Sequence, residues 1–144
     1  MPHVWIALEQ DAEGWPPVTE EEVRTEEIGE NLHRITSTPV FVPGVAVGDV
    51  LATETQPDAS VWAVAVAEQG NHWCSRVVPL GGFDPERIVE VFDSMGARTK
   101  LTRYGIVTLD VGPGIDARHV LDELEAGRAE GDWDFDLGVT PELG

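Results

Sequence analysis

The strongest architectural signal in this sequence is the stretch Thr38-Pro39-Val40-Phe41-Val42-Pro43-Gly44-Val45-Ala46-Val47-Gly48-Asp49-Val50-Leu51. It consists of two apolar runs that meet at Pro43-Gly44, a pair typical of turns. The first run, 40–42, is β-branched or aromatic and lies between two prolines, where a strand ladder can spare an N–H. We therefore expect two strands, over residues 40–42 and 45–51, joined by a turn.

Gly48-Asp49 interrupts the second run. A glycine inside a strand marks a bulge, a tight bend or a close approach of two backbones, and an aspartate beside it can accept hydrogen bonds from local N–H groups. Two interpretations fit this pair. It either opens the mouth of a ligand-binding site or forms a structural corner in a small barrel, and we favour the corner because glycine and aspartate are ordinary turn residues.

The rest of the first half consists of further short strands separated by turn signals. The predicted strands are Val4–Leu8, Glu22–Ile28, Leu32–Thr36 and Val61–Ala67. The last is apolar or small on both faces, which is typical of a central strand. Five or six short antiparallel strands bury their apolar faces most readily by curling into a barrel, so residues 1–70 are expected to form a barrel-like half.

From residue 71 onward, helical patterns enter. Asp84-Pro85 predicts a helix N-terminus before a run that stops at Gly96, and Asp116 begins a second helix that ends near Gly127. The predicted strands around them are Trp73–Leu80, Arg98–Tyr104, Ile106–Val111 and Trp133–Leu137. The order strand, helix, strand, strand, helix, strand is ferredoxin-like. We expect an α+β protein in which a ferredoxin-like half, 71–144, and the barrel-like half pack as one compact unit.

Several of these segments together resemble a bacterial family of uncharacterised domains, DUF4265. The segments are Val4-Trp5-Ile6, Leu32-His33-Arg34-Ile35, Thr38-Pro39-Val40-Phe41, Gly44 to Val50, and Gly70-Asn71-His72 leading to Ser75-Arg76-Val77-Val78. The most specific part is the Pro-Phe block followed by Gly-Val-x-x-Gly-Asp-Val, into which this chain inserts Val40. The resemblance covers most of the chain and implies the fold. It brings no catalytic residues with it.

Composition excludes several classes of partner. The chain has 27 Asp and Glu against 9 Lys and Arg, a formal net charge of −18, which disfavours nucleic acid and anionic membranes and favours a basic protein. The alternative interpretation is that the acidity only keeps the protein soluble. No basic leader precedes an apolar core, and no apolar run approaches the ~20 residues of a membrane span, so we expect a cytoplasmic protein. Cys74 is the only cysteine, which excludes an intrachain disulfide.

The candidate protein-binding residues form an acidic segment and one nearby tryptophan. They are Glu20, Glu21, Glu22, Glu26, Glu27 and Trp15. The glutamates either dock a basic protein, imitate a phosphate backbone or form a solvated face, and a solvated face is the commonest role of such runs. Trp15, in a Gly-Trp-Pro-Pro loop, is expected to be the most exposed tryptophan, where it either anchors a partner or packs over the barrel.

Catalytic and ligand-binding candidates are fewer. His72 and Cys74 are two residues apart, so a strand would place both on one face, where a thiolate and an imidazole can act together as a nucleophile. A buried, inert cysteine is the commoner outcome. His33, Asp49 and Arg76 are the candidate ligand contacts, and Arg76 either binds a carboxylate or pairs with an acidic neighbour such as Asp49.

No metal or cofactor is expected. The four histidines are scattered without the spacing of a zinc site, and one cysteine cannot anchor a thiolate site. Asp132, Asp134 and Asp136 resemble the start of a calcium loop, but Leu137 and Leu143 stand where that loop needs glycine and glutamate. A half-buried strand with an acidic outer face explains the alternation.

The leading functional hypothesis is an acidic cytoplasmic binding or accessory protein that engages another protein, in the manner of an inhibitor or immunity protein for a basic partner. The alternative is a small-molecule-binding protein or enzyme that uses a cleft between the two halves. An enzyme is the less favoured of the two, and the sequence assigns no oligomeric state.

Overall fold

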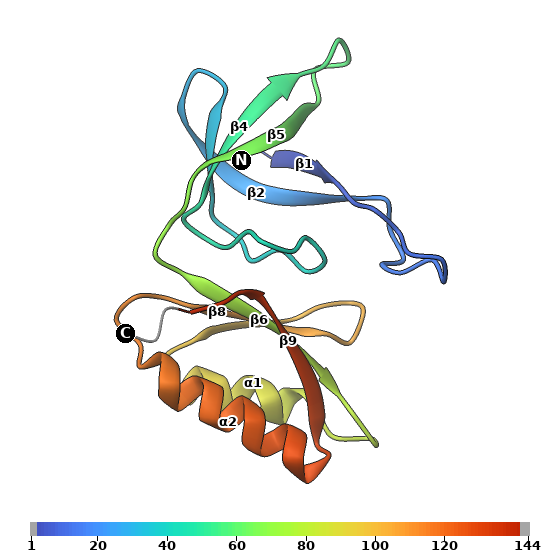
Figure 1. The fold of residues 1–144 in the computed structure, drawn as a ribbon, viewed down its shortest axis with the longest axis vertical. Coiled ribbons are helices and arrows are strands. Elements are labelled where there is room, and N and C mark those ends of the chain that lie inside the picture. Colours follow the sequence, from blue (N-terminus) through green and yellow to red (C-terminus); the bar gives the residue numbers. More distant parts are fainter. Residues whose placement is uncertain (1–2, 142–144) are drawn as a thin grey trace. The chain divides into compact units, whose positions relative to one another are not determined.

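The computed structural model describes residues 3–141 and divides into two units, Met1–Asn71 and His72–Gly144. The elements of the first unit are β1 (His3–Ala7), β2 (Glu20–Gly29), β3 (Leu32–Ile35), β4 (Val50–Thr55) and β5 (Val61–Glu68). They form a closed barrel in the order β1-β2-β3-β4-β5 (Figure 1). The barrel-like first half is therefore confirmed.

The interior of the barrel is filled by residues of its strands and of the segment between β3 and β4. The buried cluster consists of Val4, Val23, Ile35, Val42, Val45 and Leu51. Neighbouring strands are antiparallel except at the closure, where β1 and β5 are parallel and pair through Trp5 and Trp62. The predicted antiparallel pairing therefore holds for every neighbouring pair of the barrel except this one, where the first and last strands meet.

The prediction of two strands over residues 40–42 and 45–51 was wrong for most of its length. Residues 36–49 are irregular, and β4 begins only at Val50. The backbone N–H groups of residues 40, 41 and 42 do not join a sheet, because each donates to the carboxylate of Glu21. The run nevertheless enters the core, since Val42 and Val45 both belong to the buried cluster.

The strand over residues 61–67 was correctly located but is not covered on both faces. In β5, every residue from Val64 to Glu68 is exposed, and Val64 itself is 61% exposed. The pairing with β4 shifts register near this point, so the strand departs from regular alternation. Small and β-branched residues on both faces therefore did not indicate burial here.

The second unit contains β6 (Trp73–Pro79), α1 (Pro85–Ser94), β7 (Arg98–Leu101), β8 (Val107–Val111), α2 (Ala117–Glu130) and β9 (Trp133–Val139). Its sheet is antiparallel, in the order β7-β8-β6-β9, and both helices lie against the same face (Figure 1). This confirms the ferredoxin-like half. The two helices begin as predicted, because Asp84 and Asp116 accept hydrogen bonds from backbone N–H groups of the first turns.

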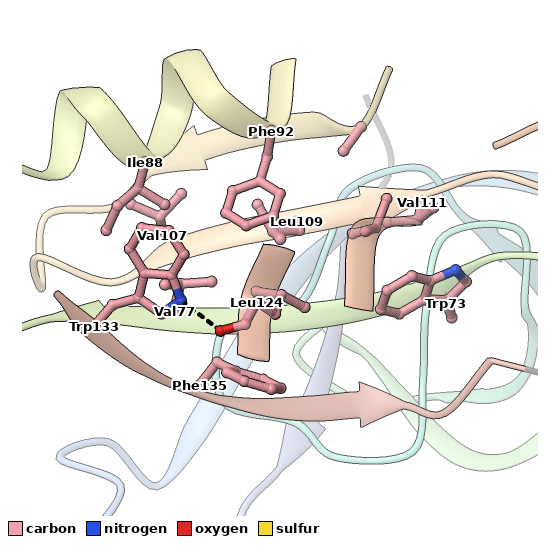
Figure 2. Packing of buried hydrophobic residues seen from close by; sticks show 12 residues of the cluster. Trp73, Val77, Ile88, Phe92, Val107, Leu109, Val111, Leu124, Trp133 and Phe135 are labelled. Atoms are coloured by element: carbon pink, nitrogen blue, oxygen red, sulfur yellow. Dashed lines mark hydrogen bonds between the residues drawn. The ribbon is translucent and has the colours of Figure 1, made fainter. Parts of the chain in front are cut away.

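An apolar core lies between these helices and the sheet. Phe92 of α1, Leu109 of β8 and Leu124 of α2 are completely buried, and Trp133 packs among them (Figure 2). The Trp133 indole Nε1 donates to the carbonyl oxygen of Leu124 at 3.0 Å.

Two boundaries in this unit differ from those predicted. The helix expected to end near Gly127 continues to Glu130 and is capped by Gly131, whose φ is +78°. Gly127 is required for packing instead, since a Cβ there would lie 2.0 Å from the Trp133 ring. The strand predicted over 98–104 ends at Leu101, because residues 102–105 form the turn into β8.

Candidate functional site

The acidic segment lies on β2, and its glutamates have different roles. Glu20, Glu22 and Glu26 alternate with core-facing residues and point outward. Glu22 lies 2.7 Å from His3 Nδ1, and Glu26 lies 3.1 Å from Arg34. The hydroxyl of Thr19 donates to Glu20, so all three outward carboxylates have a partner within the barrel unit.

Glu21 is a structural residue of the barrel. Its two carboxylate oxygens accept hydrogen bonds from the backbone N–H groups of Val40 at 2.6 Å, Phe41 at 2.9 Å and Val42 at 3.1 Å. By accepting these three hydrogen bonds, the carboxylate takes the place of the strand pairing that residues 40–42 lack. Neutralising or reversing Glu21 would thus alter the loop as well as the surface charge.

Glu27 and His33 are paired in register on β2 and β3. Glu27 is exposed, whereas His33 is buried, with its Nδ1 3.0 Å from the hydroxyl of Thr25. The His33 side chain therefore lies in the interior of the barrel unit and not on its surface.

Asp49 forms the corner that its position in the sequence suggested. It is buried, and its carboxylate accepts from the N–H groups of Ala46 at 3.0 Å and Gly70 at 2.7 Å. Gly48 takes φ of +92°, and a Cβ on Gly70 would lie 2.6 Å from the Gly48 backbone. Both the aspartate and the close backbone approach thus serve the corner.

Trp15 is 55% exposed in the described structure. Its ring meets Phe41 edge-on, with 5.7 Å between ring centroids. Its backbone N–H is held by the carboxylate of Asp11 at 3.0 Å. The loop that carries Trp15 is therefore ordered by its own hydrogen bonds.

His72 lies immediately before β6, and Cys74 and Arg76 lie within it. Asp110 of β8, which pairs in register with Cys74, lies 2.7 Å from Nδ1 of His72. A buried carboxylate on one ring nitrogen fixes the orientation of the imidazole. Cys74, however, is 3% exposed, and Gly138 leaves room for its sulfur, since a Cβ there would lie 2.7 Å from Sγ.

Arg76 forms a two-pronged ion pair with Asp136 of β9, with Nε and Nη2 each 2.8 Å from a carboxylate oxygen. Asp134, the other outward aspartate of β9, lies 3.2 Å from Arg128. These contacts show that the alternating aspartates form the outer face of a strand, where they pair with arginines. Within the described part of the chain, no three His, Cys, Asp or Glu side chains gather in a way that would hold a metal ion.

The distribution of charge between the units was not anticipated from the whole-chain composition. Residues 1–71 contain 13 Asp and Glu but only two Arg, Arg24 and Arg34, and no Lys, a formal net charge of −11. Residues 72–144 contain 14 acidic and seven basic residues, a net charge of −7. The barrel unit therefore carries most of the net negative charge, because it has about as many acidic residues as the second unit but far fewer cations.

Sequence reasoning also missed an aromatic pair on the outside of the barrel. Trp5 of β1 and Trp62 of β5 are both partly exposed, and their rings stack with 6.0 Å between centroids at 28°. Each alternates with core-facing residues, a signal that assigns it to the outer face. Their proximity depends on the parallel closure of the barrel, which no local pattern indicates.

Comparison with known proteins identifies the family. A model of the family described as "Domain of unknown function (DUF4265)" matches residues 21–135. The chain is also similar in structure to a hypothetical protein from Neisseria gonorrhoeae, with a TM-score of 0.79 at 13% sequence identity, over 98% of this chain and 96% of that one. That likeness concerns the fold alone, and no curated protein matches the chain. Within residues 3–141 no helix is long and apolar enough to cross a membrane. Because the family model spans most of the chain, this protein belongs to the DUF4265 family.

Proposed function

We propose that this chain is an acidic cytoplasmic binding or accessory protein whose barrel unit engages a basic protein and restrains it as an inhibitor or immunity protein would. The observation that supports this proposal is the charge imbalance of the barrel unit, 13 acidic residues against two arginines. A surface dominated by one sign of charge speeds encounter with a partner of the opposite sign and selects against partners of like charge.

The exposed carboxylates of β2 are the first surface to test. Glu20, Glu22, Glu26 and Glu27 are exposed, whereas Glu21 is engaged with the backbone of residues 40–42. A charge-reversed variant should therefore change the four exposed glutamates to lysine and leave Glu21 as it is. This design separates loss of docking from loss of the fold.

The experiment is a pull-down from the native lysate at low and at high salt. A matched control variant reverses four exposed carboxylates of the other unit, Asp122, Glu125 and Glu130 of α2 and Glu86 of α1. We expect a basic protein to be captured at low salt, released at high salt, lost with the β2 variant and retained with the control. Capture that survives reversal of β2, or that is lost equally with the control, would contradict the proposal.

A second candidate function, small-molecule binding or catalysis, is supported by the His72–Asp110 pair. Asp110 is buried and holds the imidazole through Nδ1, an arrangement suited to a general base. The burial of Cys74 argues against its use as a nucleophile, since a substrate must reach the sulfur. Unchanged turnover of a screened substrate by Cys74→Ser would eliminate the nucleophile, and unchanged turnover by His72→Gln would eliminate the base.

A further inference from the structure

Four side chains form a row across the outer face of the barrel, one from each of β2, β1, β5 and β4. Trp5 pairs in register with Glu22 on one side and with Trp62 on the other, and Trp62 pairs with Glu54. Residues paired across antiparallel strands lie on the same face with Cβ atoms about 5 Å apart. We call the row Glu22, Trp5, Trp62 and Glu54 the aromatic row.

The indole rings at the centre of the row present apolar surface to solvent. Both tryptophans are partly exposed, while their chain neighbours Val4, Ile6 and Val61 pack in or against the barrel core. The two rings stack on each other, so they form one continuous aromatic surface rather than two separate ones. Such a surface attracts cations through the negative faces of the rings.

Trp62 is held in place by the turn before it. Its Nε1 donates to the hydroxyl oxygen of Ser60 at 3.0 Å, and that hydroxyl donates to Asp58 at 2.5 Å. The N–H of Ser60 also donates to Asp58, at 2.9 Å. Because the ring is fixed before any ligand arrives, a bound group would not need to order it.

The two ends of the row are carboxylates in different states. Glu22 is paired with His3 at 2.7 Å. Glu54 is exposed, and among residues 3–141 no cation lies within ion-pair distance of it. The row thus offers an aromatic surface with an available carboxylate beside it, in a unit whose net charge is −11.

We propose that the aromatic row binds an arginine side chain of a basic protein partner, with the guanidinium stacked on the Trp5–Trp62 pair and hydrogen-bonded to Glu54. The proposal rests on the proposed function and names its contact. Arginine fits this site better than lysine because its planar guanidinium stacks on aromatic rings while its edge donates a fork of N–H groups to a carboxylate.

The test is a titration followed through the five tryptophan indole N–H signals in two-dimensional NMR, using the full chain. The probe is the peptide acetyl-(Gly-Arg)3-amide, and its counterpart replaces arginine by citrulline, which keeps the planar shape and removes the charge. Trp5→Leu and Trp62→Leu identify the two signals of the row. Dispersed backbone amide signals show that each variant remains folded.

We expect the arginine peptide to shift the Trp5 and Trp62 signals and the citrulline peptide to leave them in place. Trp5→Leu should raise the Kd about fivefold, and Glu54→Gln about threefold, as expected for exposed cation–π and ionic contacts. The matched control is Glu68→Gln, which removes the same charge from an exposed position of the same unit outside the row, and should change the Kd less than about twofold because salt screens distant charges.

Equal weakening by Glu54→Gln and Glu68→Gln, or a largest shift at Trp15, would overturn the aromatic row as the contact. Salt-sensitive binding would then persist elsewhere on the acidic unit, and the proposed function would stand without this site. A complete lack of binding at low salt would count against both.

Discussion

The two units of this protein hold their chains in place by different means. In the barrel unit, two carboxylates hold the irregular segment 36–49 in place. Glu21 accepts hydrogen bonds from three consecutive backbone N–H groups, and Asp49 accepts them from Ala46 and Gly70. In the second unit, an apolar core centred on Phe92 and Trp133 holds the two helices on the sheet. The difference teaches that acidic residues of the barrel unit cannot be assumed to be surface groups.

The structural roles of some barrel carboxylates also limit which of them can contact a partner. Of the barrel carboxylates, Glu21 and Asp49 serve the fold, and Glu22 and Glu26 are paired with His3 and Arg34. The charge available to a partner is therefore concentrated on fewer groups than the sequence suggests.

Removing Asp49 tests the carboxylate-held corner and should have the largest effect on stability. Asp49→Ala leaves the buried N–H of Ala46 and the partly buried N–H of Gly70 without an acceptor, so we expect the free energy of unfolding to fall by about 3 kcal/mol in urea titrations. Asp122→Ala, at an exposed position of α2, should change it by less than about 0.5 kcal/mol. Similar values for the two variants would break the contrast between the units.

A glycine substitution tests the packing of the second unit. Gly127→Ala places a Cβ 2.0 Å from the Trp133 ring, and overpacking of this kind should lower the free energy of unfolding by about 2 kcal/mol, despite the better helix propensity of alanine. Gly114→Ala is the control, since nothing lies within 4 Å of its Cβ position. Thermal and urea unfolding measure both, and a neutral Gly127→Ala would contradict the close packing.

The role of Glu21 is tested by comparing it with its neighbour. Glu21→Gln retains the shape but turns an amide toward a backbone N–H, so the free energy of unfolding should fall by about 1.5 kcal/mol. Glu20→Gln, an exposed neighbour, should be neutral within about 0.5 kcal/mol. If Glu20→Gln costs as much, general charge repulsion rather than the loop contacts determines stability.

The smallest effect concerns the turn that positions Trp62. Hydrogen bonds from the hydroxyl and then the N–H of Ser60 lower the pKa of Asp58 below its ordinary value of 3.8. Because the folded pKa is the lower one, the stabilisation is complete above pH 3.8 and is lost as the pH falls through the folded pKa. Asp58 is fully exposed, so a small contribution is expected.

An NMR titration of the Asp58 carboxyl carbon measures this pKa directly. In Ser60→Ala the pKa should return toward 3.8, and the indole N–H of Trp62 should shift because it has lost its acceptor. An unchanged pKa in Ser60→Ala would contradict the chain of hydrogen bonds from Asp58 to Trp62.

The second unit could be predicted from the sequence because its signals are local. Caps at Asp84 and Asp116 and periodic apolar residues suffice to give the order of a ferredoxin-like fold. The end of α2 was predicted too early because Gly127 resembles a helix stop. This glycine instead makes room for the Trp133 ring of β9, a contact that no local helix-stop rule considers.

The barrel unit was predicted in outline only. The run over 40–42 has strand propensity, yet its N–H groups bind Glu21, about twenty residues earlier in the chain. The corner at Asp49 was predicted correctly because turn chemistry is local. The aromatic row could not be predicted, since Trp5 and Trp62 meet only through a parallel closure between the first and last strands.

The most direct test of the central claim, that the exposed carboxylates of the barrel unit face a basic partner while others hold the fold, is carboxyl footprinting. Each Asp and Glu is labelled with a carbodiimide and glycine ethyl ester, with and without the arginine peptide, and read by mass spectrometry. We expect Asp49 to be unreactive in both states, Glu20 and Glu54 to react and to be protected by the peptide, and Asp122 and Glu130 of α2 to react equally in both. Protection on α2 without protection on the barrel unit, or ready labelling of Asp49 in the folded chain, would contradict the account.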